Sequence, residues 1–195
     1  MFLTHFQTVG RDLFTSGLVS GTSGNLSIRV NDRIVITKRS SSLSNLQEQD
    51  LIETGICKND RFTPMASSEL AVHRAIYQLT SATAIVHAHP PHAVALSLTE
   101  DGIVPSDDEG KALITYVPVL GSQNFSSVPP VVPPEDIAKA LQHSRIVMVR
   151  GHGSFAIGQI LEEAYDLTAT LEDSCKILCL IKSLPVKPVT EPYYY

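Results

Sequence analysis

Two short runs with apolar residues at every second position lie close together near the start of the chain. They occupy residues 26–30 and 33–37, and only Asn31 and Asp32 separate them. Strands with one buried face show this alternation, and a two-residue loop that begins with Asn favours the tight turn of a β-hairpin. The chain therefore has to pair at least two strands in antiparallel fashion, which excludes an all-helical fold and an all-parallel sheet.

Helices and further strands alternate along the rest of the sequence. Apolar residues spaced three and four apart predict helices, and short β-branched runs predict strands. A second hairpin is expected within 51–62, around Lys58, Asn59 and Asp60, and Pro118 indicates an edge or a bulge in its strand. We expect helices at 2–13, 69–79, 92–98, 134–141 and 161–181, and strands at 84–89, 116–120, 145–149 and 154–158. This pattern predicts an α/β protein whose antiparallel or mixed sheet is covered by helices.

Length and composition limit the class of protein. The 195 residues suffice for one domain, predicted as 1–195 with a tail at 185–195, but fall short of the about 250 that a (β/α)₈ barrel needs. A formal net charge of −5 argues against a nucleic-acid partner. No apolar run approaches the ~20 residues that span a bilayer, so no membrane partner is expected. The first residues do not resemble a signal peptide, and three cysteines form no even disulfide set. We therefore expect a reduced, cytoplasmic protein.

Three of the seven histidines stand where a metal site is possible. His87 and His89 end an apolar strand, and residues two apart in a strand point to the same face. His152 follows another apolar strand and has a glycine on each side, which allows a sharp turn and close approach to a ligand. Three neutral imidazoles with an open fourth position suit catalytic Zn²⁺. Ordinary hydrogen bonds at strand ends and turns remain the alternative for each of them.

Other combinations of histidines and acids compete with this set. His87, His89 and His92 resemble the histidine run of metallo-β-lactamase-like hydrolases, but Pro91 stands where such a site needs an Asp. Glu69 and His73 are four apart on one predicted helix and are able to ligate together, yet such pairs commonly serve only helix stability. His5 and His143 lie in surface-like helical contexts and are expected to have no ligand role.

Five short motifs together resemble one known family. They are GTSGN at 21–25, ITKRS at 36–40, SSE at 67–69, HAHP at 87–90 and GHG at 151–153. In this order and spacing they resemble the class II aldolase/adducin family, over about residues 3 to 183, and most closely its L-fuculose-1-phosphate aldolase-like members. The resemblance implies a three-layer α/β/α fold around a central, largely antiparallel sheet. It also implies a homotetramer whose zinc sites, one per subunit, lie near the subunit interfaces.

The resemblance also assigns roles to individual residues. His87, His89 and His152 match the zinc ligands, and Glu69 matches the acid that ligates the resting metal and then acts as catalytic acid and base. The matches to the substrate-phosphate site are Gly24, Asn25, Ser67 and Ser68, with Arg39 and Ser40 as weaker additions, because ITKRS departs from the usual Thr-Pro-Thr/Ser-Gly. Without the resemblance, the two serines would be helix caps, Gly24 and Asn25 a plain turn, and Arg39 a solvated charge.

The implied reaction is the zinc-dependent, reversible cleavage of a ketose 1-phosphate, of the L-fuculose-1-phosphate type, to dihydroxyacetone phosphate and an aldehyde through an enediolate. Glu69 favours this reaction, because dehydratase relatives generally lack that acid. Asp107, Asp108 and Glu109 favour the alternative, a sugar-phosphate dehydratase or 4-epimerase, of the methylthioribulose-1-phosphate or ribulose-5-phosphate type. A non-catalytic adducin-like module is the third possibility, and the retained histidines argue against it. A C-terminal tyrosine closes over the aldolase site, which gives Tyr193–Tyr195 a possible role.

Overall fold

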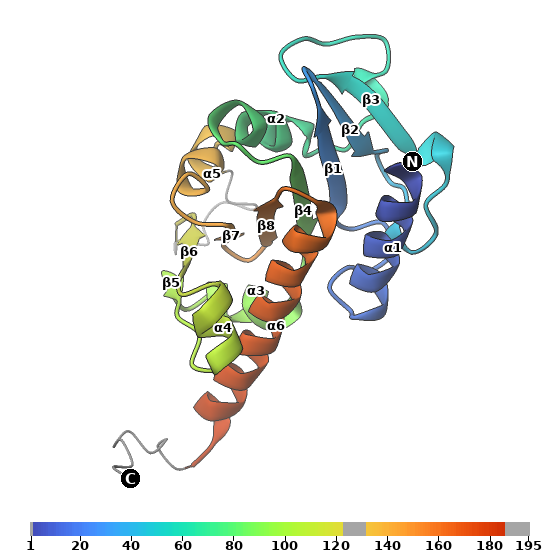
Figure 1. The fold of residues 1–195 in the computed structure, drawn as a ribbon. Coiled ribbons are helices and arrows are strands. Elements are labelled where there is room, and N and C mark those ends of the chain that lie inside the picture. Colours follow the sequence, from blue (N-terminus) through green and yellow to red (C-terminus); the bar gives the residue numbers. More distant parts are fainter. Residues whose placement is uncertain (1, 123–131, 186–195) are drawn as a thin grey trace.

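An eight-stranded sheet with helices on both faces forms the centre of the molecule (Figure 1). The structure is a computed structural model and describes residues 2–122 and 132–185. The strands are β1 (Asn25–Val30), β2 (Arg33–Thr37), β3 (Leu51–Gly55), β4 (Ala84–Ala88), β5 (Gly102–Ile103), β6 (Val117–Leu120), β7 (Ile146–Val149) and β8 (Gly153–Gly158). The α-helices are α1 (Phe2–Thr15), α2 (Leu70–Leu79), α3 (Pro91–Ser97), α4 (Asp108–Leu113), α5 (Pro134–Ala140) and α6 (Leu161–Ser183). Short 3₁₀ helices are η1 (Leu43–Asn45), η2 (Glu48–Asp50) and η3 (Thr63–Met65).

The strand order places segments from distant parts of the chain next to one another. It is β3-β2-β1-β4-β8-β7-β6-β5, and each neighbouring pair is antiparallel except β6 with β7. The sheet is therefore mixed and largely antiparallel, as predicted. Because β4 lies between β1 and β8, His87 is the register partner of Asn25 on one side and of Phe155 on the other.

The first hairpin is confirmed. β1 and β2 pair with Val30 opposite Arg33, and Asn31 has a φ of 57° in the turn between them. Asn tolerates this left-handed conformation better than most residues, which is why an Asn-Asp pair closes the turn.

Alternate residues of the central strands enter two separate cores. Ala84, Val86 and Ala88 of β4 belong to the core that contains residues of α1, α3 and α6, whereas Ile85 belongs to the core formed with α2 and α5. Figure 1 shows these helices on opposite faces of the sheet, with α6 as the longest of the described helices. This arrangement is the predicted three-layer α/β/α fold. None of the described helices is long and apolar enough to cross a membrane.

The second predicted hairpin, within 51–62, is wrong. β3 is present and pairs with β2, but no strand follows it within this described segment. Instead, a carboxylate oxygen of Asp60 accepts hydrogen bonds from Thr54 Oγ1 and from the backbone of Phe62 and Thr63. Local side-chain hydrogen bonds of this kind compete with strand pairing. The sequence therefore predicted the turn correctly but not the backbone conformation that follows it.

The segment after α3 contains two elements that the sequence did not predict, β5 and α4. Pro118 lies in β6, which is not an edge strand because β5 lies outside it. β5 has only two residues, and its Gly102 is the register partner of Pro118. Asp107 caps α4 by accepting a hydrogen bond from the Gly110 backbone at 2.8 Å. Apart from Pro185, the predicted tail lies outside the described residues, and so do Tyr193–Tyr195.

Candidate functional site

Three histidines from two distant segments meet at one end of the central strands. His87 lies in β4, His89 follows it directly, and His152 lies in the turn between β7 and β8. Their ligand nitrogens all lie within 4.8 Å of one another, and the Nε2 atoms of His87 and His89 are 3.0 Å apart. Among the residues that the structure describes, this is the one group of histidine, cysteine or acidic side chains with metal-site spacing. The predicted set of histidines is therefore brought together.

The orientation of His87 is fixed from two sides. Its Nδ1 lies 2.9 Å from the carbonyl oxygen of Ser154, and its ring stacks on Phe155 with the centroids 4.2 Å apart. A carbonyl only accepts hydrogen bonds, so Nδ1 carries the proton and Nε2 keeps its lone pair. Since His87 is only 1% exposed, its free nitrogen faces the other two histidines rather than solvent.

The turn that carries His152 depends on its two glycines. Gly151 has a φ of +66°, which a side chain rarely adopts, and a Cβ on Gly153 would lie 2.4 Å from the carbonyl oxygen of Ala88 and 2.7 Å from the ring of His89. Glycine at 153 therefore lets the two histidine segments approach each other.

Arg150 holds the base of the same turn. It is 2% exposed, and its guanidinium donates to the carbonyls of Gly121, Ser97 and Glu100 and to a carboxylate oxygen of Asp101. A charged group that is taken out of water needs such partners, because burying it unpaired is costly. The contacts of Arg150 therefore fix the backbone just before His152.

Burial keeps His87 and His89 neutral. It lowers the pKa of His87 well below the usual range, and the neighbouring His89 and His152 lower it further. Burial, together with His152, lowers the pKa of His89 to about 4. Near pH 7 both imidazoles therefore have a lone pair available. Three converging imidazoles form a donor set that suits Zn²⁺ with an open coordination position, so these residues fit a metal ion.

The pocket around the histidines contains every residue predicted for the metal and phosphate sites. Besides His87, His89 and His152, it is lined by Thr22, Ser23, Gly24, Asn25, Lys38, Arg39, Ser40, Ser67, Ser68 and Glu69. These residues come from the loop before β1, the turn after β2, the start of α2, the end of β4 and the β7–β8 turn. The structure thus joins the five sequence motifs in one place.

One buried side-chain atom at the wall of this pocket has no hydrogen-bond partner among the described residues. Asn25 is 5% exposed, and its Oδ1 accepts no hydrogen bond. Gly24 beside it has a φ of +75°, and a Cβ there would lie 2.9 Å from the carbonyl oxygen of His87. Ser67 Oγ accepts a hydrogen bond from the Glu69 backbone, while the exposed Ser68 does not cap α2, whose N-cap residue is Glu69. Helix capping therefore leaves Ser68 available to a ligand.

Comparison with known proteins identifies the family. The sequence profile of the class II aldolase and adducin N-terminal domain matches residues 4–179. The chain belongs to this family. The crystal structure of L-fuculose-1-phosphate aldolase from Thermus thermophilus is similar, with a TM-score of 0.84 and 38% identity over 94% of this chain and 97% of that one.

Relatives with other activities are similar to nearly the same extent. A probable bifunctional methylthioribose-1-phosphate isomerase/methylthioribulose-1-phosphate dehydratase of Nocardia farcinica is 30% identical over 86% of this chain. The matched region is 33% of the length of that relative, so the chain spans about a third of it. A 3-oxo-tetronate 4-phosphate decarboxylase of Escherichia coli O6:H1 is 26% identical over 93% of this chain and 88% of its own length. Membership of the class II aldolase family therefore does not by itself specify the reaction.

The remaining described histidines lie outside the pocket of this family member. His92 does not join His87 and His89, because its Nδ1 pairs with the buried carboxylate of Glu172 at 2.6 Å. His73 is fully buried and its Nδ1 lies 2.6 Å from Ser27 Oγ. His5 contacts Glu162, and His143 is exposed.

The acids at 107–109 also lie elsewhere. Asp107 and Glu109 line a separate hollow with Asp166 and Asp173 of α6, and neither lines the histidine pocket. Within one chain, these carboxylates are therefore not part of the candidate site.

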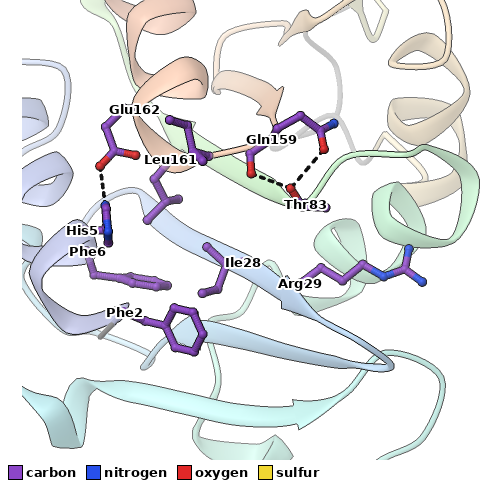
Figure 2. A pocket seen from close by; sticks show the side chains of 10 residues that line it. Phe2, His5, Phe6, Ile28, Arg29, Thr83, Gln159, Leu161 and Glu162 are labelled. Atoms are coloured by element: carbon purple, nitrogen blue, oxygen red, sulfur yellow. Dashed lines mark hydrogen bonds and ion pairs between the residues drawn. The ribbon is translucent and has the colours of Figure 1, made fainter.

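The most apolar of the described hollows is also separate from the histidines. It lies between α1, β1 and the start of α6, and Figure 2 shows Phe2, Phe6 and Ile28 facing it. The pair formed by His5 and Glu162 borders it on one side. None of the predicted site residues lines this hollow.

Sequence reasoning missed two kinds of residue. Lys38, Thr22 and Ser23 line the histidine pocket but were not predicted to do so, although all three lie within or beside the recognised motifs. Arg150 precedes the GHG motif directly, but its role depends on carbonyls from α3 and from Gly121, which no local pattern reveals.

Proposed function

We propose that this protein is a zinc-dependent aldolase that reversibly cleaves a ketose 1-phosphate, similar to L-fuculose 1-phosphate, into dihydroxyacetone phosphate and an aldehyde. The observation that carries the proposal is the shared pocket. Three histidines with metal-site spacing, a carboxylate and a set of hydrogen-bond donors line the same space. The 38% identity to an L-fuculose-1-phosphate aldolase supports the same choice.

His87, His89 and His152 would hold the metal ion, with Glu69 as a further ligand while no substrate is bound. A bound Zn²⁺ would supply Lewis-acid stabilisation of the negative charge that develops on the substrate oxygens, an effect worth several kcal/mol. The protein's part is to keep His87 and His89 neutral through burial, to orient His87 through the carbonyl of Ser154, and to bring His152 close through its flanking glycines.

We propose that Glu69 moves the proton. It is half-buried at the start of α2 and lines the pocket together with the histidines. As the carbon–carbon bond breaks, the Glu69 carboxylate can accept the hydroxyl proton of the carbon that becomes the aldehyde, while the electron pair of the broken bond remains on the dihydroxyacetone phosphate part. The resulting carboxylic acid can return that proton to the carbon that holds the electron pair. The carboxylate removes the same proton in the direction of synthesis. General acid–base catalysis of this kind contributes about 10²–10⁴-fold to the rate.

The substrate phosphate is proposed to bind beside Glu69. Ser67, Ser68 and the Gly24–Asn25 backbone offer hydrogen-bond donors, and the ten-residue helix α2 directs the positive end of its dipole toward this side. Arg39 and Ser40 line the same pocket and complete the phosphate-binding set predicted from the sequence.

The test is a direct assay of the reaction. The purified protein is incubated with Zn²⁺ and a panel of ketose 1-phosphates, and dihydroxyacetone phosphate is measured with a coupled reductase. We expect product from at least one ketose 1-phosphate and a loss of about 10²-fold or more in Glu69→Gln. Gln keeps the shape of the side chain but cannot transfer the proton. Absence of dihydroxyacetone phosphate from every substrate would refute the aldolase proposal.

Dehydration of a sugar phosphate is the second candidate, or 4-epimerisation in the same family. The similarity to the methylthioribulose-1-phosphate dehydratase relative favours dehydration. Decarboxylation, as named for another relative, requires the same stabilised carbanion. Incubation with methylthioribulose 1-phosphate, ribulose 5-phosphate and 3-oxo-tetronate 4-phosphate, followed by mass spectrometry, separates these reactions from aldol cleavage. The complete set of histidines and Glu69 supports catalysis over a non-catalytic adducin-like role.

We further propose a homotetramer with its sites at subunit interfaces, acting on a small phosphorylated sugar in the cytoplasm without nucleic-acid or membrane partners. Exposed apolar side chains, such as Val104, Tyr116 and Leu180, support association, because surfaces of this kind are commonly covered by another chain. Light scattering after size exclusion at several concentrations tests the assembly, and a monomeric mass at all of them would contradict it.

A further inference from the structure

Glu172 of α6 carries a buried carboxylate that the proposed reaction does not use. Its side chain is 2% exposed, and α6 packs beside α3 (Figure 1). One carboxylate oxygen accepts hydrogen bonds from the backbone N–H groups of His92 and Ala93, at 3.0 and 3.2 Å. The other lies 2.6 Å from Nδ1 of His92, and this nitrogen donates because a carboxylate only accepts. Glu172 therefore binds three donors at the start of α3.

These contacts replace a cap that α3 cannot form by itself. The first N–H groups of an α-helix have no partner within the helix, and a polar side chain at the N-cap position commonly accepts from one of them. In α3 this position is Pro90, and Pro91 follows it as the first helical residue, so neither side chain has an acceptor. A negative charge at this end also interacts favourably with the helix dipole. Glu172 thus holds the first turn of α3 from a neighbouring helix.

The start of α3 is tied directly to a histidine of the pocket. Only Pro90 separates His89 from α3. Because proline rings restrict φ at two successive positions, this connection has little freedom to bend. The backbone N–H of His89 also donates to the carbonyl of Leu18 at 2.8 Å. The place of the first turn of α3 and the contact with Leu18 therefore determine together where His89 lies.

The last residue of α3 contacts the other histidine segment. Ser97 is fully buried, and its Oγ accepts a hydrogen bond from the backbone N–H of Gly151 at 2.9 Å. Its carbonyl oxygen accepts from Arg150 at 2.6 Å. Since His152 follows Gly151 directly, α3 links the backbone beside His89 to the backbone before His152. A shift of α3 would displace both segments.

We propose that Glu172 is a positioning residue of the metal site, which sets the spacing of His89 and His152 by holding α3 in place. Glu172 does not line the histidine pocket, so it acts on the metal through the backbone of α3. This inference rests on the proposed function, because it takes the three histidines as metal ligands. A residue that only packs α6 against α3 would change stability and leave the metal affinity of the folded protein unchanged.

The affinity of the metal-free, folded protein for Zn²⁺ tests the inference without relying on turnover. Competition with a fluorescent zinc chelator measures it in wild type and in Glu172→Leu, which removes the acceptors with little change in volume. We expect the dissociation constant to rise about 10–100-fold, the usual loss when a group that orients a metal ligand is removed. The visible absorption of bound Co²⁺ should change as well, because it depends on the ligand geometry.

Two further variants of the same residue separate its hydrogen bonds from its bulk. Glu172→Gln should recover an affinity within about threefold of wild type, because its amide oxygen can accept from both backbone N–H groups. Glu172→Asp keeps the charge but is one carbon shorter, so it should weaken zinc binding several-fold even where Glu172→Leu does not fold. Without recovery in Glu172→Gln, the lost hydrogen bonds are not the cause and the proposal fails.

Leu161→Ala is the matched control, because Leu161 is buried in the same helix but lies at the apolar hollow, away from α3. It should lower stability through lost packing and keep the wild-type zinc affinity. Wild-type zinc affinity in both Glu172→Leu and Glu172→Asp would overturn the proposal, and so would an equal loss in Leu161→Ala. If the wild type binds no zinc, the proposed function fails and the inference with it. If zinc binds but no ketose 1-phosphate is cleaved, the proposed reaction fails alone.

Discussion

The histidine pocket and the apolar hollow of Figure 2 differ in what their polar groups do. In the hollow, His5 bonds to Glu162, Thr83 bonds to Gln159, and Arg29 donates to main-chain carbonyls. In the histidine pocket, the ligand nitrogens of three histidines from two segments converge within 4.8 Å, and the buried Asn25 Oδ1 beside them accepts no hydrogen bond from a described residue. The difference teaches that side chains able to share one ligand, gathered from distant segments, indicate a candidate site better than apolar area does.

The largest expected effect comes from removing a histidine of the pocket. His87→Ala should lower the zinc content from about one ion per chain to near zero and the activity by about 10³-fold, since metal catalysis supplies several kcal/mol. Elemental analysis of the dialysed protein measures the first effect. The matched control is His5→Ala in the apolar hollow, where a half-exposed pair contributes about 0–1 kcal/mol to stability and nothing to the metal site. If both His87→Ala and His152→Ala keep their full zinc content, the three histidines do not form a metal site.

The close approach of the two histidine segments gives the next largest effect. Gly153→Ala places a Cβ 2.4 Å from the carbonyl oxygen of Ala88, so we expect a loss of about 2 kcal/mol in the free energy of unfolding. It should also weaken zinc binding. Gly17→Ala is the control for zinc binding: its φ of +71° makes an Ala strained there, so stability should fall as well, but nothing lies within 4 Å of the added carbon. If both variants keep wild-type zinc affinity, the tight fit around Gly153 does not shape the site.

The buried His73 should make the stability of the fold depend on pH. Burial lowers the pKa of His73 to about 3, so the folded protein keeps this imidazole neutral while the unfolded chain takes up a proton below about pH 6.5. The stability contributed by neutral His73 is therefore complete above pH 6.5 and is lost as the pH falls toward 3. Between these values the unfolding free energy should fall by about 1.4 kcal/mol per pH unit from this one group.

Urea unfolding at pH 7, 5.5 and 4.5 measures that slope. His73→Asn should make it shallower by this amount, whereas Ile76→Val, in the same helix and without a titratable group, should lower stability equally at each pH. Parallel curves for wild type and His73→Asn would contradict the prediction.

The parts of the fold that were predicted depend on local signals. Asn31 in a two-residue turn and the alternation on both sides of it specify the hairpin, and the apolar run that ends in His87 and His89 specifies β4. The second hairpin was predicted from the same kind of signal and failed, because Asp60 binds the backbone ahead of it and closes the turn differently. A local pattern shows that the chain turns but does not show which side chain stabilises the turn.

The pocket residues within the sequence motifs could be predicted, whereas the side chains that hold these segments in place could not. Motif order selected His152 as the third histidine and Ser68 as a pocket residue, and both lie where they were expected. Arg150 and Glu172 were not foreseen, because the sequence separates each from its partners by tens of residues. Asp107, whose charge suggested a catalytic role, instead caps α4.

The insertion of β4 between β1 and β8 has a consequence for how the protein acquires its ligands. Asn25, His87 and Phe155 become neighbours only when strands from the beginning, middle and end of the chain have paired. Pairings so distant in sequence form late and slowly, so neither a metal ion nor a phosphate can guide the early steps of folding. Both would bind the finished fold and stabilise it by mass action. A chain that is cut between β1 and β8, and whose pieces separate, should therefore lose the whole histidine pocket.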